Sequence, residues 1–527
     1  MYQRFNAGLK PLSRQLAPAK LARRLILLAA LTLAGCASVP FDYPKIATYS
    51  RAPDPNTVMG NAAAQWQQEN GDESGFIGLT SGIDALGARL RMMAAAQNTI
   101  DAQYFILKND RAGALFVGKM LLAADRGVKV RLLIDDIFSP GIDRQLTLLD
   151  SHPNIEVRMF NPVSRNSLRY WAYLLDFGRA NRRMHNKSFT VDGSMSIVGG
   201  RNIGEEYFEL TQDVLFDDYE VFVLGPVVKE IGAGFDEFWN SQLAVPVAAF
   251  RAPIDPAELE RWRQLMREEA DAGAKGIYSQ AVNSTMLRDI REKRITPVPA
   301  EAVLITDSPD KLLHKVGTQE LAVLAREKAR RFAAAKQEVA IVTPYFIPQK
   351  EGRELIKGLV ARGVRVVIIT NSLASTNHVA VHGHYARYRK RLLQAGAEIY
   401  EIRAAFEGEA TAWGHSPEQV TLHSKASVID RQTIFVGSLN FDPRSIRLNT
   451  EMGLFIESST VGAAFAEAVM RELPRVTYKV DLDTSGNLRW TYSGGDTPVV
   501  RHKEPQASWG RRFMAGFYRT LPIENQL

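Results

Sequence analysis

Two stretches of the sequence carry the same polar side chains at the same spacing. The first begins at His185 and the second at His423, and both fit the template His-x-Lys, four residues, Asp, six residues, Gly-Gly/Ser-x-Asn. The copies start 423 − 185 = 238 residues apart, which is nearly half of the 527-residue chain. A single His-x-Lys is typical of a surface strand, but two full copies in register indicate a function.

These residue types suit chemistry at phosphorus. A histidine and a lysine two residues apart on a strand project from the same face. A neutral imidazole can attack phosphorus and a protonated imidazole can release an alcohol, while lysine supplies fixed positive charge for phosphoryl oxygens. Two copies provide two imidazoles, as a two-step displacement through a covalent intermediate requires.

The segments around the motifs must form a sheet that positions them. Residues 83–96 and 112–126 have helical periodicity, and residues 99–107 and 128–134 have strand patterns. The second half repeats this order, with strands expected at 339–347 and 364–369 around a helix at 355–363. Strand and helix alternation predicts an α/β fold, and the repeat predicts two fused copies of one lobe with both motifs at their interface.

The double motif resembles that of the phospholipase D superfamily, whose members carry it twice. Further matches are NPVS at 161–164, GGRNIGEEY at 199–207, TNSL at 370–373, FDPRS at 441–445 and NTEMG at 449–453. Together they are similar to the cardiolipin synthase branch, closest to its bacterial C type, from about residue 76 to the C-terminus. The resemblance implies two phospholipase D-like α/β/α sandwich lobes. Asn377-His378 departs from the pattern, because an acidic residue is expected there, and this bears on the choice of acceptor.

The resemblance also implies roles for individual residues and a phosphohistidine intermediate without a metal or other cofactor. The motif residues are the catalytic candidates: His185, Lys187, Asp192, His423, Lys425 and Asp430. His185 is the expected nucleophile and His423 the general acid and base. The side chains expected to bind phosphoryl oxygens are Lys187, Asn202, Lys425 and Asn440, with Gly200 and Ser438 allowing close approach.

Carboxylates near the motifs need separate interpretation. The family gives Asp192 and Asp430 a structural role, and their position seven residues after each histidine agrees with it. Asp218 and Glu451 each precede an apolar strand, and the resemblance implies that Asp218 orients His423 and Glu451 orients His185. A carboxylate on one imidazole nitrogen fixes the tautomer and raises basicity. The alternative is that both are surface acids at the start of a strand.

The expected reaction makes cardiolipin from phosphatidylglycerol and a second phospholipid, either phosphatidylethanolamine or phosphatidylglycerol. A phospholipase D hydrolase that releases phosphatidic acid is the nearest alternative, because residue types do not separate water from an alcohol acceptor. A nuclease and a non-catalytic lipid-binding lipoprotein are further alternatives. Phospholipids and a membrane surface are the expected partners, nucleic acid is not, and the sequence identifies no accessory protein.

The N-terminal segment has the features of a targeting signal. Residues 1–35 contain six basic residues and no acid, so removing them from the net charge of +7 leaves 7 − 6, or about +1. Such a protein is a poor candidate for gripping long nucleic acid by counterion release. The apolar run from Leu25 to Ala34 is too short to span a bilayer and fits a signal peptide.

That run ends in Leu33-Ala34-Gly35-Cys36, which resembles the lipobox of a bacterial lipoprotein. Cys36 is the only cysteine and the expected lipidation site; an uncleaved anchor or a chance cysteine is the alternative. A lipid anchor would hold the protein at the bacterial cell envelope, facing the periplasm. The absence of aspartate from Ala37-Ser38 favours the outer membrane over the inner.

Composition and repeat boundaries divide the chain into six parts. We expect a signal peptide at 1–36, a flexible tether at 37–75, a first lobe at 76–245, a linker or insertion at 246–320, a second lobe at 321–475 and a tail at 476–527. The linker contains a charged helical stretch at 258–270 and is expected to hold little catalytic content.

Three further features carry open interpretations. His378, His382 and His384 crowd one segment, and we expect a wall of the acceptor pocket there, with His382 and Tyr385 matching the family, in preference to a metal site. Residues 165–183 interleave aromatic and arginine side chains, which suits either anionic lipid headgroups or a core helix with basic flanks. The tail spaces Trp509, Phe513, Phe517 and Leu521 four residues apart, and the basic residues Arg511, Arg512 and Arg519 fall on other faces of the same helix. This pattern suits either a helix that lies on a membrane or a helix packed on the parent domain.

Overall fold

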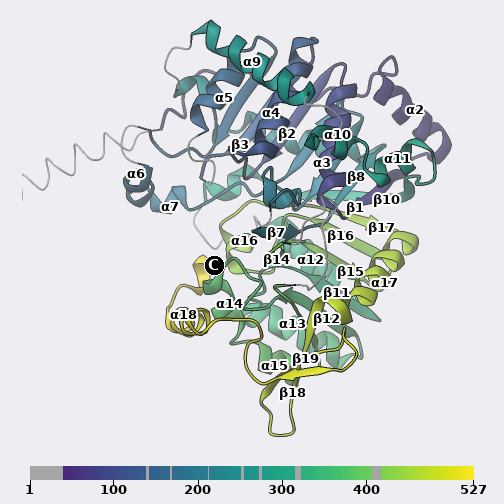
Figure 1. Cartoon of the computed structure of the whole chain (residues 1–527), viewed down its shortest axis with the longest axis vertical. Coiled ribbons are helices and arrows are strands. Elements are labelled where there is room, and N and C mark those ends of the chain that lie inside the picture. The colour runs from purple at the N-terminus through teal and green to yellow at the C-terminus, as the bar shows by residue number, and fades with distance from the viewer. Residues whose placement is uncertain are drawn as a thin grey trace, which may run out of the picture.

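The computed structural model describes residues 39–137, 142–165, 169–211, 213–250, 255–271, 276–314, 322–405 and 417–527. Figure 1 shows two lobes stacked along the long axis, the first in purple to teal and the second in green to yellow. Each lobe has a mixed sheet covered by helices, as the alternating sequence pattern predicted. The fold class expected from the sequence is therefore confirmed.

The sheet of the first lobe follows the order β9-β4-β3-β2-β5-β6-β8-β1. Strands β2, β3 and β4 are parallel to each other, and the other neighbours are antiparallel. The strands are β1 (Ser74–Leu79), β2 (Thr99–Tyr104), β3 (Lys129–Asp135), β4 (Ile155–Phe160), β5 (Ser188–Val191), β6 (Met195–Gly199), β8 (Glu220–Leu224) and β9 (Ala244–Pro246).

The sheet of the second lobe repeats this order strand for strand, as β18-β13-β12-β11-β15-β16-β17-β10, with β19 and β20 added beyond β18. The strands are β10 (Val298–Thr306), β11 (Glu338–Val342), β12 (Arg365–Asn371), β13 (Glu398–Ile402), β15 (Ala426–Ile429), β16 (Thr433–Gly437), β17 (Met452–Glu457), β18 (Thr477–Leu482), β19 (Leu488–Tyr492) and β20 (Val499–Arg501). Strand β10 joins the sheets, because its first residues pair with β1 and the rest pair with β17.

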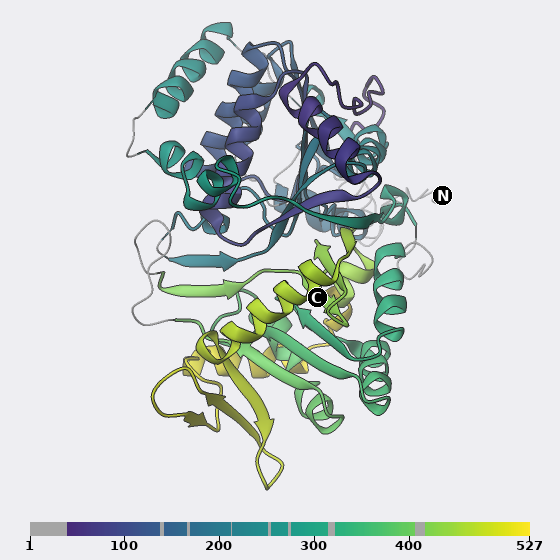
Figure 2. The ribbon, with the colours of Figure 1, turned by 90° about the vertical axis from the view of Figure 1, so that its right-hand side faces the viewer.

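Helices cover the sheets of both lobes (Figure 2). Those of the first lobe are α2 (Val58–Asn70), α3 (Gly82–Ala95), α4 (Arg111–Asp125), α5 (Asp143–Asp150), α6 (Arg169–Leu175), α7 (Phe177–Ala180) and α8 (Val227–Asn240). The connecting region adds α9 (Pro256–Asp271), α10 (Ile277–Val282) and α11 (Thr285–Arg291). The later helices are α12 (Val323–Ala333), α13 (Gln349–Ala361), α14 (Val379–Tyr385), α15 (Arg389–Gln394), α16 (Pro443–Arg447), α17 (Ser459–Val476) and α18 (Trp509–Thr520).

Equivalent helices end in the same way in the two lobes. Helix α4 is followed by Arg126-Gly127 and α13 by Arg362-Gly363, and both glycines have positive φ, at 100° and 82°. Glycine adopts this left-handed conformation without steric cost, so it ends the helix and turns the chain into the next strand. The repeated Arg-Gly pair in the sequence thus sets where β3 and β12 begin.

Three segments differ from the boundaries that composition predicts. Residues 37–75 were expected to be a flexible tether, but in the described part, from residue 39 on, residues 58–70 form α2 and the residues before it pack on the first lobe. Arg131 donates to the Thr48 carbonyl at 2.9 Å, and Lys45 donates to the carbonyls of Ser241 and Ala244 at 2.6 Å each. Hydrogen bonds from side chains to backbone carbonyls therefore run in both directions between this segment and the lobe, and composition does not reveal them.

The connecting region and the tail also belong to the lobes. Helices α9 and α10 of the expected linker pack on α4 and α3, and β10 is the shared strand. The second lobe continues past residue 475, because β18 pairs with β13 at the sheet edge. No described helix is long and apolar enough to cross a membrane, and the expected signal peptide and Cys36 lie outside the described residues.

Candidate active site

Each His-x-Lys segment is hydrogen-bonded to the opposite lobe. The His185 N–H donates to the Thr450 carbonyl at 3.0 Å, and the Thr450 N–H donates to the Arg183 carbonyl at 3.0 Å. In the other copy, the N–H groups of His423 and Ser424 donate to the Asp217 carbonyl at 2.7 and 3.0 Å. Strands β7 (Val214–Asp217) and β14 (Gln419–Leu422) form a parallel pair between the lobes just before this contact. The backbone therefore delivers residues 218 and 451 to the opposite histidine.

The structure places the two carboxylates as the resemblance implies. Nδ1 of His423 lies 2.5 Å from Oδ2 of Asp218, and Nδ1 of His185 lies 2.8 Å from Oε2 of Glu451. All four side chains are buried. Because both carboxylates occupy Nδ1, each imidazole is left with Nε2 as its reacting nitrogen.

The two carboxylates have opposite electrostatic settings. Burial raises the pKa of Glu451 to about 7, although the Lys187 ammonium opposes this rise. Burial would also raise the pKa of Asp218, but the Lys425 ammonium and the His423 imidazole outweigh it and hold that pKa well below its usual value. Asp218 is therefore fully ionised at neutral pH, whereas Glu451 is about half protonated.

Burial and the lysines favour neutral imidazoles. Burial and the Lys425 ammonium lower the pKa of His423 to about 3, against the opposing effect of Asp218. Burial, followed by Lys187 and Lys425, holds the pKa of His185 well below its ordinary value. Burial lowers the pKa of Lys187 to about 7 and that of Lys425 to about 8. A bound phosphodiester would offset this positive charge and favour protonation of an imidazole.

Aromatic rings fix the planes of both imidazoles. The ring of Phe105 meets that of His185 edge to face, with 4.8 Å between centroids. Phe216 stacks on His423 at 5.1 Å, and Tyr207 meets His423 edge to face at 5.3 Å. Phe105 and Phe216 were not among the residues predicted from the sequence, whereas Tyr207 is the last residue of the GGRNIGEEY match.

The lysines and asparagines of the motifs lie inside the protein. The Lys187 ammonium donates to the His185 carbonyl at 2.5 Å, and the Lys425 ammonium lies 3.2 Å from Nε2 of His423. Asn202 is fixed by the N–H of Ile106 at 3.2 Å and the Tyr207 hydroxyl at 2.9 Å. Oδ1 of Asn440 is buried and has no hydrogen-bond partner among the described residues.

Gly200 and Ser438 occupy equivalent positions in the two motifs, but Gly200 leaves space for the Asp218 carboxylate, whereas Ser438 donates a hydrogen bond to Glu451. A Cβ at Gly200 would lie 2.2 Å from Oδ1 of Asp218, so only glycine leaves this carboxylate its space. The hydroxyl of Ser438 donates to Oε2 of Glu451, which also faces His185. These contacts are more specific than the close approach expected from the sequence.

Asp192 and Asp430 act on the backbone at the far ends of their strands. Asp192 accepts from the N–H groups of Gln97, Asn98 and Thr99, and Asp430 accepts from those of Lys336, Gln337 and Glu338. Both aspartates have a φ of 52°. They hold the turn before β2 and β11, and they are not catalytic in the sense of touching the reacting atoms.

Other buried ionic groups surround the histidines. Arg183 pairs with Asp135 at 3.1 Å, and both side chains are fully buried. Asp307 pairs with Lys311 at 2.7 Å and accepts from the Glu451 N–H at 3.2 Å, so the expected linker supports the site. Arg444 lies close enough to lower the pKa of His185, and its presence in the FDPRS match was the available sequence signal.

The histidine-rich segment is not arranged as a single pocket wall. His382 faces Glu504 at 3.6 Å and His384 faces Glu524 at 3.3 Å, while the Tyr385 hydroxyl donates to Glu401 at 3.0 Å. These contacts tie α14 to the C-terminal segment and to a buried ionic network. His378 differs, because it meets the Tyr345 ring edge to face at 5.3 Å, and burial together with the Arg444 guanidinium lowers its pKa. In the described residues, no group of three or more His, Cys, Asp or Glu is arranged to hold a metal ion.

Comparisons with known proteins agree with this arrangement. A family model described as cardiolipin synthase, phospholipase D-like domain, matches residues 90–239 and 329–473. Cardiolipin synthase C of Escherichia coli K12 is 36% identical over 455 residues, covering 86% of this chain and 96% of that protein. A cardiolipin synthase of Oceanobacillus iheyensis is 25% identical and covers 76% and 68%, respectively. The crystal structure of phosphatidylserine synthase from Haemophilus influenzae Rd KW20 has a similar fold, with a TM-score of 0.54 at 14% identity over 89% of this chain and all of that one.

Proposed function

Because this chain belongs to the cardiolipin synthase family of phospholipase D-like proteins, we propose that it joins two phospholipids into cardiolipin through a phosphatidyl-histidine intermediate. Phosphatidylglycerol is the acceptor, and phosphatidylethanolamine or phosphatidylglycerol is the donor. The observation that carries the proposal is the pair of buried imidazoles, each held at Nδ1 by a carboxylate of the opposite lobe.

In the first step, Nε2 of His185 attacks the phosphorus of the donor. The bond from phosphorus to the headgroup oxygen breaks, and the leaving alcohol takes a proton from Nε2 of His423. Lys187 and Lys425 stabilise the charge on the non-bridging oxygens. The negative phosphodiester offsets the two ammonium groups, so His423 gains its proton as substrate binds.

In the second step, neutral His423 removes a proton from a glycerol hydroxyl of phosphatidylglycerol. The oxygen attacks phosphorus, the phosphorus–nitrogen bond breaks, and His185 leaves as a neutral imidazole. Fixed positions of both histidines supply the orientation that makes each step effectively unimolecular.

The settings of the carboxylates support this assignment of roles. Asp218 is ionised throughout the neutral range and raises the proton affinity of His423, as an acid and base requires. Glu451, where it is ionised, accepts the Nδ1–H of His185 and leaves the Nε2 lone pair for attack, and its raised pKa makes this support increase with pH through neutrality. Burial of all four carboxylate and imidazole groups also limits water at the intermediate, which favours transfer over hydrolysis.

The test uses purified full chain in mixed micelles with EDTA, supplied with phosphatidylglycerol alone and then with phosphatidylethanolamine. Mass spectrometry should find cardiolipin, and the released alcohol, glycerol or ethanolamine, identifies the donor. His185→Ala and His423→Ala should abolish the product, while His502→Ala, a change at an exposed histidine near β20, should not. Phosphatidic acid without cardiolipin would replace the synthase with a hydrolase, and no lipid product in either mixture would favour the nuclease or scaffold.

We also propose that the protein is lipid-anchored through Cys36 at a periplasm-facing membrane, and that one face of the molecule lies on the bilayer. The described residues begin at Val39, three positions after Cys36, and three residues can span at most about 10 Å. Phe41 lies 5.1 Å beneath the Arg179 guanidinium of α7. An anchor at Cys36 would therefore enter the membrane close to α6 and α7.

Helices α6 and α7 expose a cluster of large apolar side chains. Tyr170 and Trp171 are 68% and 56% exposed, and Leu174, Leu175 and Phe177 are exposed as well. Arg165 and Arg183, which flank these helices in the chain, turn inward instead, because Arg165 pairs with Asp136 and Asp143, and Arg183 pairs with Asp135. Aromatic side chains of this kind favour the interface between water and hydrocarbon.

Helix α18 has its apolar stripe turned outward. Trp509, Phe513 and Phe517 are 76%, 59% and 50% exposed. Arg511 donates to the carbonyls of Leu373 and Thr376 on the inner side, where Ala515 packs near Gly383. In Figure 1, α6, α7 and α18 project from the same side of the molecule, on either side of the C-terminus. Packing on the parent domain thus uses the arginine side and leaves the aromatic side for the bilayer.

Flotation of the non-acylated protein with vesicles of phosphatidylethanolamine and phosphatidylglycerol tests this face. Replacing Trp509, Phe513 and Phe517 with serine should release the protein into the unbound fraction without lowering the thermal midpoint, since these side chains make few internal contacts. Serine at the exposed Val500 is the matched control. Unchanged flotation of the triple variant would reject α18 as part of the docking face.

A further inference from the structure

The second lobe contains a cavity of about 580 Å³ between α12 and α13, which the catalytic histidines do not line. This volume lies in the usual range of small-molecule sites. Apolar side chains form most of its wall: Ala325, Ala329, Phe332, Ile347, Leu355, Leu439, Phe441 and Ile446. Four basic residues also line it, Lys311, Arg326, Lys328 and Arg447, against a single acid, Glu351.

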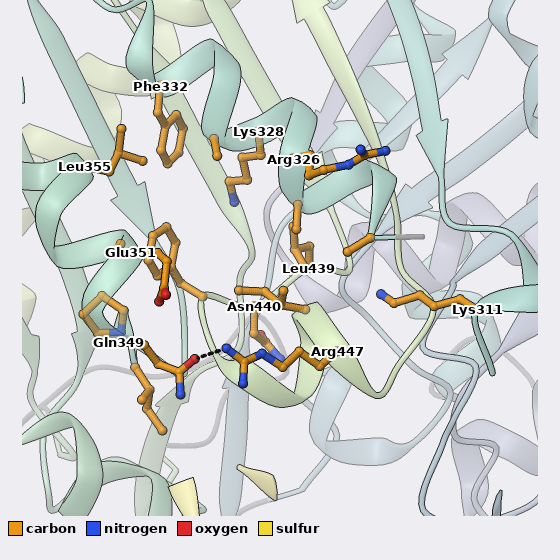
Figure 3. A pocket seen from close by; sticks show the side chains of 18 residues that line it. Lys311, Arg326, Lys328, Phe332, Gln349, Glu351, Leu355, Leu439, Asn440 and Arg447 are labelled. Carbon is orange, nitrogen blue, oxygen red and sulfur yellow. Dashed lines mark hydrogen bonds between the residues drawn. The ribbon is translucent and has the colours of Figure 1, made fainter. Parts of the chain in front are cut away.

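Lys328 is the deepest of these cations. It is only 5% exposed, and its ammonium makes no hydrogen bond or ion pair with any residue that the structure describes. It lies 4.1 Å from the centre of the Phe435 ring. Figure 3 shows its nitrogen pointing into the space that Leu355, Leu439 and Asn440 border. The buried Oδ1 of Asn440 likewise has no partner in the described part of the chain.

The first lobe shows how such a buried cation is neutralised when it serves the fold alone. The aspartates that cap the two turns make Thr99 equivalent to Glu338, so the positions ten residues earlier, Arg89 and Lys328, are equivalent. Arg89 pairs with Glu220 at 2.6 Å and with the Tyr104 hydroxyl at 3.0 Å. Burial of a charge is stabilised there by a carboxylate inside the protein.

The second lobe lacks both of these partners. Glu220 pairs with Gly199 across the sheet, and the equivalent pair in the second lobe is Gly453 with Gly437. A Cβ at Gly453 would lie 2.3 Å from the Phe435 ring, so no carboxylate fits there. Thr343 stands where the first lobe has Tyr104. The second lobe therefore has a cation at this position, but an aromatic ring and a cavity lie where the first lobe has a carboxylate.

We propose that this cavity binds the phosphate of an anionic phospholipid, with Lys328 as the main counter-charge and the apolar walls of α12 and α13 against the lipid's apolar part. The choice of a phospholipid rests on the proposed function, whereas the site itself is separate from the catalytic histidines. Asn440 lies at the wall nearest the second motif, where its amide N–H can donate to the phosphate and its unpaired Oδ1 can accept from a hydroxyl of the headgroup. Arg326 and Arg447 add positive charge along the lining, and Arg447 is held by Gln349 at 2.9 Å.

Binding at this site should depend on pH through Lys328. Burial lowers the pKa of Lys328 to about 7, while Glu451 opposes this effect. The other charged groups of the lining are Glu351 on α13, Lys311 beside Asp307, Arg326 on the same helix and Arg447 on α16. A bound phosphate favours the protonated ammonium, so affinity should fall by up to about tenfold per pH unit as the pH rises above 7.

The experiment measures binding without turnover, by calorimetry on full-length His185→Ala protein. The probes are monomeric dihexanoylphosphatidylglycerol and inorganic phosphate. We expect the lipid to bind, Lys328→Met to weaken it about tenfold to a hundredfold, and Ala325→Trp, which fills the cavity, to weaken it as well. Lys357→Met removes an exposed lysine of α13 and is the matched control.

Proton uptake separates a binding role from a structural one. At pH 8, the heat of lipid binding should vary with the ionisation enthalpy of the buffer in the parent protein, and this variation should be smaller in Lys328→Met. Equal lipid affinity in the parent and Lys328→Met would overturn the site. Inorganic phosphate binding as tightly as the lipid, with Ala325→Trp unaffected, would overturn the lipid assignment. Wild-type protein that makes no cardiolipin but shows Lys328-dependent lipid binding would refute the proposed function alone.

Discussion

Replacing the two histidine-orienting carboxylates with their amides should have different consequences at different pH. The pKa of Asp218 is held well below its usual value, so this group stays ionised across the neutral range. The pKa of Glu451 is raised to about 7 by burial, so this group changes from about one-tenth ionised at pH 6 to about nine-tenths at pH 8. An amide imitates the protonated acid and not the ionised one.

For Asp218→Asn we therefore expect a large loss that does not vary with pH. A carboxylate-to-amide change behind the imidazole of a Ser-His-Asp triad lowers kcat about 10⁴-fold. Here the contact is a 2.5 Å bond between buried groups, and its removal also takes from the Lys425 ammonium the largest of its counter-charges. The expected loss is about 10³-fold to 10⁴-fold at both pH 6 and pH 8.

For Glu451→Gln the ratio of wild-type to variant rate should rise with pH. Its ionised fraction grows about ninefold between pH 6 and pH 8, so the ratio of kcat/KM values should grow by up to the same factor. Titrations common to both proteins cancel in this ratio. Initial rates of cardiolipin formation in mixed micelles at half-unit pH steps provide the assay. A flat ratio for Glu451→Gln, or one that falls with pH, would refute the reasoning from unequal carboxylates.

Three further predictions follow from buried polar contacts. Because the pKa of Glu451 rises from 4.5 to about 7 on folding, this group stabilises the protein below pH 4.5 and loses that contribution as the pH rises through 7. The free energy of unfolding of Glu451→Gln, measured with denaturant, should therefore increase by about 3 kcal/mol relative to that of the wild type between pH 4.5 and pH 8. Gly200→Ser should displace Asp218 and lower the rate of cardiolipin formation at least tenfold, whereas Ser438→Gly at the equivalent position should have a smaller effect; equal losses would contradict this. Asp192→Ala should lower unfolding free energy by at least about 2 kcal/mol, measured by urea denaturation, because three N–H groups lose their acceptor; Asp430→Ala should cost less, since water reaches its partly exposed turn.

Much of the fold could be predicted from hydrophobic periodicity, because in both lobes the local sequence pattern agrees with the helix or strand that forms there. The expected helices at 83–96 and 112–126 correspond to α3 and α4, and the expected strand at 128–134 corresponds to β3. The packed segment before α2 was missed, because its contacts are made by side chains of distant strands such as Arg131. Strand β10 was missed for a related reason, since its two partners lie in different lobes.

The orientation of surface helices also lies beyond sequence pattern. The four-residue spacing of Trp509, Phe513 and Phe517 predicts one apolar face on α18 but does not say which way that face points. The structure turns it outward because Arg511 finds two carbonyl acceptors on the inner side. The hydrogen bonds from Arg511 to the distant carbonyls of Leu373 and Thr376 therefore determine which face of α18 points outward, and the hydropathy pattern does not.

The differences between the two lobes explain how a duplicated fold can assign unequal roles. Strand order and the capping aspartates are retained in both lobes, so the two imidazoles are positioned alike. Divergence is concentrated in charges around them: an aspartate faces one histidine and a glutamate the other. The same holds farther out, where Arg89 keeps an internal carboxylate and Lys328 does not. In the proposed mechanism, this symmetric frame with asymmetric charges suits one histidine to attack and the other to transfer protons, and in the proposed lipid site it leaves one buried cation for a ligand.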